Sequence, residues 1–201
     1  MNNAVSKAGA CIVTLTVFLF GVFIVSGFSA GQYFVCALLP IGYIMTAAGF
    51  HHESEPDRRV AANVGLILAG VYAVLVLLVY FSQNTYVWQN DLSEQAEKAL
   101  HFAPGSLTFC YDLLGYGIMA LSTFFIGLSL KPSDKPDKAL RWLLLIHGAF
   151  FPGCFIMPMT RIFSGASGGS GIGGNLALLV WCVYFLPIGI LSFRHFSDKS
   201  N

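Results

Sequence analysis

The chain has 201 residues, 56% of them hydrophobic and only 10% charged, with a formal net charge of +1. Soluble domains carry about 25% charged residues because their surface faces water, so this composition excludes a soluble globular protein. The chain also has no basic stripe, which excludes a nucleic-acid partner. The lipid bilayer is therefore the expected partner of most of its surface.

Six apolar stretches follow one another along the chain, each long enough to cross a membrane as a helix of about 20 residues. Helices are expected because every backbone polar group in lipid needs a partner within the segment. The sequence predicts an all-α fold, a single transmembrane domain over residues 1–201 built as a six-helix bundle. The spans are expected at approximately 9–28, 33–50, 61–82, 106–130, 140–160 and 174–193.

The basic residues divide unevenly between the two sides of this bundle. Two of the eleven, Lys98 and Arg161, lie on one side, and nine lie on the other. Cytoplasmic loops carry an excess of Lys and Arg, so both termini are expected in the cytoplasm, with the protein in the inner (plasma) membrane. The nine residues are Lys7, Arg58, Arg59, Lys131, Lys135, Lys138, Arg141, Arg194 and Lys199.

The longest loop contains a segment near 91–102 with apolar side chains at helical spacing. Glu94, Glu97 and Lys98 lie on its other side. This pattern predicts a short amphipathic helix that lies on the outer surface or caps the bundle.

The run His51-His52-Glu53, after the second span, has the residue types of a metal site. Adjacent residues on a helix point about 100° apart, and the zinc signature HExxH is absent. The run is therefore interpreted as a helix end at the membrane interface, with a metal or lipid-headgroup contact as the alternative. No metal and no cofactor is expected.

Asp112 is the only charged residue well inside a predicted span, where a carboxylate is costly and is usually satisfied or functional. Thr108 and Tyr116 share its helical face, so this face should point into the bundle. Arg161, at the outer end of the fifth span, is the expected partner. Three interpretations remain open: a structural ion pair, a site for a ligand, proton or ion, and an Asp112 that is exposed because its helix starts later.

His147 lies in the fifth span, where an imidazole with a reference pKa near 6.5 can relay protons. The alternative is a structural hydrogen bond to a neighbouring helix. Pro152 and Pro158 in the same span remove backbone donors and predict a bent helix. The candidate polar site comprises Asp112, Arg161, His147, Tyr116 and Thr108.

Four segments carry a family resemblance: APGSL at 103–107, DLLGYG at 112–117, MALS at 119–122 and RWLLLIHG at 141–148. Together they resemble a bacterial and archaeal family of small multi-span integral membrane proteins, a domain of unknown function. The likeness covers roughly residues 60–195. It implies that Asp112 and the Gly115-Tyr116 pair belong to the family-like segment, and it implies no catalytic residue.

Three functions compete on these observations. The favoured one is small-molecule or ion handling at a polar site near Asp112. The second is a structural or regulatory membrane protein in which Asp112 and Arg161 form a packing ion pair. The third is a membrane-embedded enzyme that acts on lipid, ranked last because neither GxSxG nor HExxH spacing is present. An enzyme is therefore less expected than a protein without catalysis, and no catalytic residue is assigned.

Overall fold

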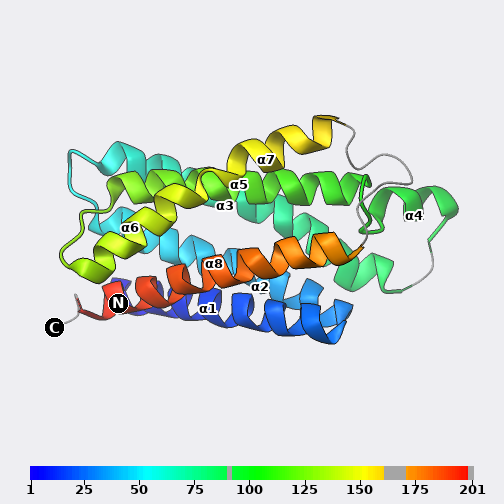
Figure 1. Ribbon diagram of the computed structural model, residues 1–201, viewed down its shortest axis with the longest axis horizontal. Coiled ribbons are helices and arrows are strands. Elements are labelled where there is room, and N and C mark those ends of the chain that lie inside the picture. The colour runs from blue at the N-terminus through cyan, green and yellow to red at the C-terminus, as the bar shows by residue number, and fades with distance from the viewer. Residues whose placement is uncertain (90–91, 161–170, 199–201) are drawn as a thin grey trace.

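The computed structural model describes residues 1–89, 92–160 and 171–198. These residues form a bundle of long helices that run side by side, and the start of α1 lies at the same end as the end of α8 (Figure 1). We call this end the terminal end of the bundle. The opposite end, where α4 lies, is called the distal end.

The long helices are separated by short connections. The first five elements in chain order are α1 (Asn2–Ser26), α2 (Ser29–Glu53), α3 (Arg59–Ser82), α4 (Glu94–Leu100) and α5 (Leu107–Ser129). The remaining three helices are α6 (Lys135–His147), α7 (Phe150–Ile156) and α8 (Gly171–Asp198). A π-helical turn, Gln83–Val87, extends α3, and a 3₁₀ turn, Met157–Thr160, follows α7.

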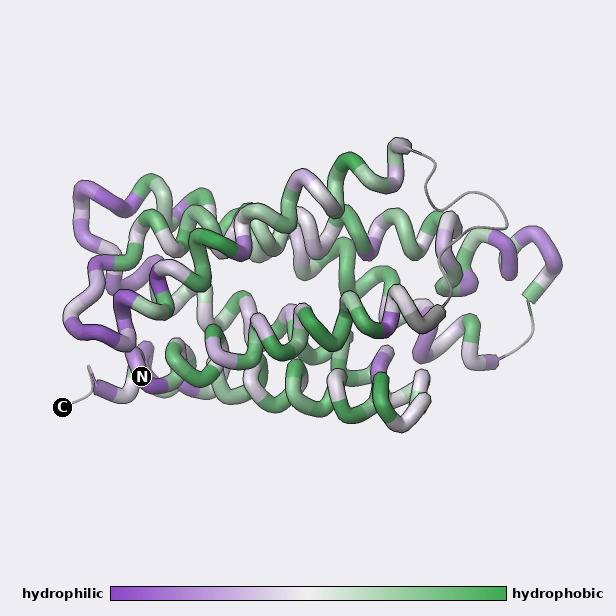
Figure 2. The backbone as a smooth tube through the Cα atoms, in the orientation of Figure 1, coloured by the Kyte–Doolittle hydropathy of each residue, from purple (hydrophilic) through white to green (hydrophobic). Residues whose placement is uncertain are grey.

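Within the described residues, six helical segments are long and apolar enough to cross a membrane. The fifth of them, Lys135–Thr160, is made of α6, α7 and the 3₁₀ turn. Figure 2 shows apolar residues along the middle of the bundle and hydrophilic residues at its two ends. A helix of 25 residues, such as α1, is about 37 Å long, which exceeds the hydrocarbon core of about 30 Å. The all-α six-helix bundle is confirmed, and the protein is a multi-pass integral membrane protein.

Close helix contacts hold the bundle together. A Cβ added at Gly9 of α1 would lie 2.6 Å from the Met45 Cβ and 2.8 Å from the Gly42 carbonyl oxygen of α2. Helices in membranes associate by packing rather than by hydrophobic exclusion, so small residues at the contact are effective. Gly9 and Gly42 therefore allow the backbones of α1 and α2 to approach closely.

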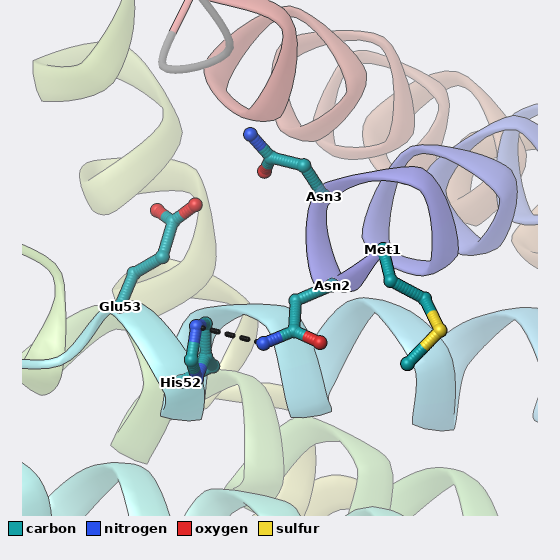
Figure 3. Close-up of a pocket in the computed structure, with 5 residues that line it drawn as sticks. All are labelled: Met1, Asn2, Asn3, His52 and Glu53. Carbon is teal, nitrogen blue, oxygen red and sulfur yellow. Dashed lines mark hydrogen bonds between the residues drawn. The ribbon is translucent and has the colours of Figure 1, made fainter.

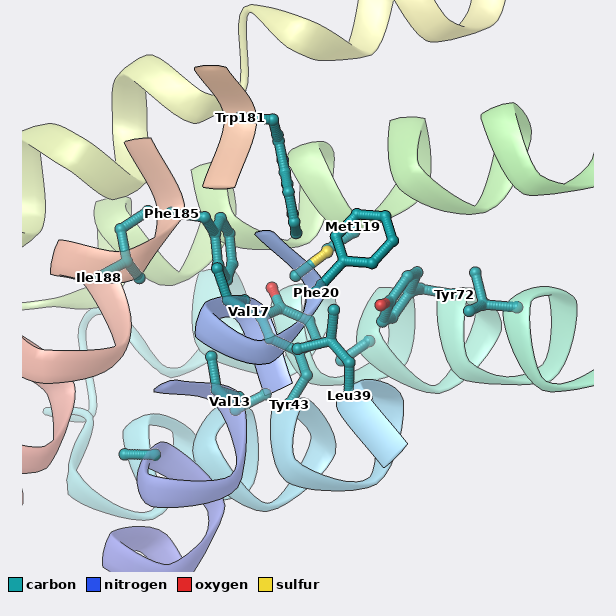
Figure 4. Close-up of a cluster of buried hydrophobic side chains, with 14 of the residues drawn as sticks. Val13, Val17, Phe20, Leu39, Tyr43, Tyr72, Met119, Trp181, Phe185 and Ile188 are labelled. Carbon is teal, nitrogen blue, oxygen red and sulfur yellow. The ribbon is translucent and has the colours of Figure 1, made fainter. Parts of the chain in front are cut away.

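The middle of the bundle is filled by side chains from several helices, as Figure 4 shows for Met119, Trp181 and Phe185. Met119 and Phe185 are completely buried. The Tyr43 hydroxyl of α2 donates to the Ser122 Oγ at 2.9 Å. The Ser122 hydroxyl of α5 in turn donates to the Gly65 carbonyl of α3 at 2.6 Å. This relay ties three helices together inside the apolar core.

The fifth span is broken, as its prolines predict. α6 ends at His147 and α7 begins at Phe150. Pro152 has no N–H to donate to the carbonyl four residues earlier, that of Gly148, which explains why a regular helix does not continue through this point.

The amphipathic segment near 91–102 forms α4, which is shorter than predicted. The Ser93 side chain caps its start by accepting from the Ala96 N–H. The half-buried side chains include Ala96 and Leu100, and the charged ones are exposed. The predicted amphipathic face is therefore the face that contacts the bundle.

Candidate functional site

Asp112 lies in the second turn of α5, at the distal end of the bundle. The Ser106 side chain caps α5 by accepting from the Phe109 N–H at 3.2 Å, so the helix begins at Leu107. Asp112 faces inward and is only 8% exposed. The interpretation that the helix starts later and leaves Asp112 exposed is therefore wrong.

The Asp112 carboxylate is incompletely satisfied. Its Oδ1 atom is buried and has no hydrogen-bond partner among the described residues. The Tyr80 phenol of α3 lies beside the carboxylate. No ion pair joins Asp112 to a cationic side chain within the described part of the chain. A buried charge without a partner costs several kcal/mol, so this arrangement needs a reason.

Four tyrosines from three helices lie near this carboxylate, and we call Tyr33, Tyr72, Tyr80 and Tyr116 the tyrosine cage. Each of them lies within electrostatic range of Asp112. The rings of Tyr33 and Tyr80 lie 6.0 Å apart, and those of Tyr72 and Tyr116 lie 5.7 Å apart. The Tyr72 hydroxyl is also buried and makes no hydrogen bond of ordinary length within the described residues.

The cage is assembled by the packing of α3 on α5. Tyr72, Val76 and Tyr80 are four residues apart and share one face of α3. A Cβ added at Gly115 of α5 would lie 2.7 Å from the Val76 Cγ2, so the missing side chain allows this face to approach α5. The Cys36 thiol of α2 completes the group, with the Tyr116 hydroxyl 3.9 Å from its sulfur.

Of the residues predicted for the site, Tyr116 joins Asp112 and Thr108 has another role. The Thr108 hydroxyl donates toward the carbonyls of Leu100 and His101, at 3.2 and 3.3 Å. It therefore fixes the connection between α4 and α5. Arg161 lies outside the described residues, so its pairing with Asp112 stays a prediction.

His147 lies in the interior of the bundle and is held on both sides. The Trp181 Nε1–H donates to its Nε2 atom at 3.1 Å, and its Nδ1 atom lies 2.8 Å from the Thr123 hydroxyl oxygen. Because the indole N–H can only donate, Nε2 must accept, and the ring proton is on Nδ1. The Thr123 hydroxyl accepts from this N–H and donates its own hydrogen bond to the Ala120 carbonyl at 2.7 Å. His147 is thus a neutral, satisfied ring, which favours the structural interpretation over the proton relay.

The side chains of His52 and Glu53 do not converge on one point. The His52 Nε2 atom lies 3.1 Å from the Asn2 Nδ2 atom, while Glu53 extends in another direction (Figure 3). These side chains border an open pocket at the terminal end together with the first residues of α1. Glu53 instead contacts His195 of α8, at 3.0 Å between carboxylate oxygen and Nε2.

Sequence reasoning missed most of the tyrosine cage and the partner of Glu53. The signal for the cage was the spacing of Tyr72 and Tyr80 on one helical face inside a span. No protein-family model matches the chain, and no solved structure matches it. Function is therefore inferred from the chemistry of the site alone.

Proposed function

We propose that this membrane protein handles a small ion or small molecule, and that Asp112 is the group that binds it. The observation that carries the proposal is the buried Asp112 Oδ1 atom without a hydrogen-bond partner among the described residues. Ionisable residues inside membrane bundles mark ion and substrate sites because their burial is otherwise unfavourable.

The chemistry of the site favours a cation. The carboxylate supplies one negative charge, and the tyrosine cage supplies aromatic faces that attract cations, together with hydroxyl oxygens. Tight packing of Gly115 against Val76 restricts the ligand to a small one. The ligand class that fits best is a small monovalent cation, with the proton as its smallest member.

The distribution of basic residues supports a direction of access. All described Lys and Arg residues except Lys98 lie in loops at the terminal end of the bundle or within the two helical turns next to it. By the positive-inside rule, this end faces the cytoplasm of a plasma membrane, with both termini inside. Asp112 then lies in the outer half of the bilayer, where a ligand would reach it from outside.

Cation-dependent thermal stability tests the proposal directly. Purified wild-type protein and Asp112→Asn would be unfolded by heat in mild detergent, with the cation of the buffer changed from N-methylglucamine to Li⁺, Na⁺, K⁺ or methylammonium. A ligand that binds only the folded state stabilises it by about 2.7 kcal/mol at a concentration 100 times its Kd. The wild type should show a saturable rise of the unfolding midpoint with at least one cation, and Asp112→Asn should show none.

If the ligand is the proton, a different measurement is needed. Infrared spectroscopy detects the carbonyl band of a protonated carboxyl group. A band that changes with pH in the wild type and is missing in Asp112→Asn would identify the proton as the ligand. If no cation stabilises the wild type and no such band exists, the proposal is wrong. An equal response of Asp112→Asn to the stabilising cation would place the site elsewhere.

A further inference from the structure

We propose that the terminal end of the bundle contains a second buried site, which binds one proton between Glu53, His195 and Asp137 and thereby clamps three helices together. We call these three residues the terminal clamp. They come from the end of α2, the last turns of α8 and the first turn of α6. The clamp is separate from Asp112 and does not depend on the function proposed for it.

His195 lies between the two carboxylates. Its Nδ1 atom is 2.7 Å from the Asp137 Oδ1, and its Nε2 atom is 3.0 Å from the Glu53 Oε2. The side chains are 1% exposed at His195, 7% at Asp137 and 17% at Glu53. The rings of Phe50 and Phe196 lie 5.5 and 5.4 Å from the imidazole, so the imidazole is enclosed by apolar neighbours.

The two short contacts determine how many protons the clamp contains. A neutral imidazole has one N–H donor and one accepting nitrogen. Here both nitrogens of His195 face oxygens of acidic groups, so one contact in the neutral state would join a lone pair to a carboxylate. Both contacts are favourable only if one further proton is present, on the imidazole or on a carboxyl group. The clamp then has a charge of −1 rather than −2.

The surroundings of Asp137 stabilise its carboxylate form. Its Oδ2 atom accepts from the Ser133 hydroxyl at 2.6 Å and from the Ser133 N–H at 3.1 Å. The Asp134 side chain caps α6 by accepting from the Asp137 N–H at 2.8 Å, which fixes the position of the residue. We therefore assign Asp137 as a carboxylate and the proton to His195, whose imidazole is a stronger base than the Glu53 carboxylate.

A small pocket gives the proton a route to water. It has a volume of about 110 Å³ and is bordered by Glu53, Ser54, Ser129, Lys131 and His195, among others. A water molecule occupies about 30 Å³ of liquid volume, so the pocket can hold a few waters. Proton exchange is therefore possible at the Glu53 side of the imidazole.

The neighbouring charged groups have partners of their own. Arg194 of α8 pairs with Asp134 and Asp198, each at 3.3 Å. Lys131 pairs with Glu55 at 2.8 Å. The Arg58 guanidinium donates to the Leu130 carbonyl at 3.2 Å.

Further titratable groups at this end are the amino terminus, Lys7 of α1, and His51 and His52 of α2. The His52 ring contacts Asn2. Among the described groups around the clamp, His195 lies between two carboxylates in an enclosed position, whereas the two carboxylate contacts of Arg194 are at the exposed surface.

The direction of the pH effect follows from the proton count. With the proton bound, His195 donates to both carboxylates, and α2, α6 and α8 are held together. When the proton leaves at higher pH, one carboxylate faces a bare nitrogen and the clamp loosens. The stabilisation is thus fully present below the reference pKa of imidazole, about 6.5, and is lost as pH rises above it.

Replacing Glu53 by glutamine tests the clamp. In Glu53→Gln, the amide N–H can donate to the Nε2 of a neutral His195, while Nδ1–H still donates to Asp137. We expect the unfolding midpoint of the wild type to fall as pH rises above about 6.5, the reference pKa of imidazole. The midpoint of Glu53→Gln should lose this slope. Glu55→Gln, in the exposed pair with Lys131, is the matched control and should keep the wild-type slope.

Nitrogen NMR of the wild type gives a second reading that needs no variant. Of the five histidines, His147 and His195 are the enclosed ones in the described structure. Near pH 6 we expect two rings that exchange slowly with water, one with both nitrogens protonated and one with a single protonated nitrogen. If both slow rings carry a single proton, or if Glu53→Gln keeps the full pH slope, the proposal is overturned.

Discussion

Two aspartates are buried to a similar extent at opposite ends of the bundle, with 8% exposure at Asp112 and 5% at Asp137. Asp137 accepts two hydrogen bonds from Ser133 on one oxygen and contacts His195 with the other. Asp112 has Tyr80 beside it and one oxygen with no partner among the described residues. The same residue type is thus a completed structural element at one end and an incomplete site at the other.

The comparison shows how burial and function are related in this protein. A buried polar group is expected to be satisfied by hydrogen bonds, and Asp137 shows that this chain can satisfy a carboxylate in full. The missing partner of the Asp112 Oδ1 atom among the described residues therefore sets this site apart from that of Asp137. This is why Asp112, and not Asp137, is proposed to bind a ligand.

Removing the charge of Asp137 should have the largest effect. In Asp137→Asn, an amide can no longer accept from Ser133 and His195 at the same time, and the imidazole loses a counter-charge. Breaking a buried pair costs about 3–5 kcal/mol. Chemical or thermal unfolding in mild detergent measures this loss.

Asp134→Asn provides the control for that change. Asparagine caps a helix start about as well as aspartate, so the loss should be well under that of Asp137→Asn. If the free energy of unfolding of Asp137→Asn equals that of the wild type, Asp137 does not stabilise the bundle and its contrast with Asp112 fails.

Removing the Tyr80 hydroxyl should have an intermediate effect. Tyr80→Phe keeps the ring but removes the hydroxyl group that lies beside the Asp112 carboxylate. Hydrogen bonds to charged groups contribute about 1.5–3 kcal/mol. Tyr86→Phe is the matched control, because Tyr86 is 49% exposed and surface changes are usually within about 0.5 kcal/mol.

A double-mutant cycle locates the Tyr80 effect. The loss caused by Tyr80→Phe should shrink when Asp112 is already asparagine. An equal loss in both backgrounds would mean that Tyr80 stabilises the bundle by packing alone.

The helices and the inward direction of Asp112 could be predicted from the sequence because both depend on local patterns. Apolar length marks the spans, and the period of the helix places Thr108, Asp112 and Tyr116 on one face. The bend in the fifth span followed from Pro152, whose missing N–H is a property of the residue itself.

The tyrosine cage could not be predicted, because its members come from three helices whose relative register no local pattern determines. Tyr33 and Tyr80 are brought together only by the packing of α2 and α3. A tyrosine in a predicted span is also usually interpreted as an apolar residue or as an interface anchor, so the sequence gives no signal that its hydroxyl belongs to a polar site.

The terminal clamp was missed for a different reason. The predicted spans ended at residues 50 and 193 and began at 140, but α2 continues to Glu53, α8 continues to Asp198 and α6 starts at Lys135. Glu53, His195 and Asp137 all lie in the extra helical turns. Charged residues end the apolar runs that define a span, so hydropathy assigned these turns to loops.

The stability of Asp112→Asn in buffer without candidate cations tests the central claim most directly. Asparagine keeps the shape of the side chain and can accept from Tyr80, while the buried charge is removed. An unsatisfied buried polar group costs about 1–3 kcal/mol, so unfolding of Asp112→Asn should require at least as much free energy as that of the wild type. A loss of about 3–5 kcal/mol, the result expected if Asp112 and Arg161 form a structural ion pair, would contradict the account.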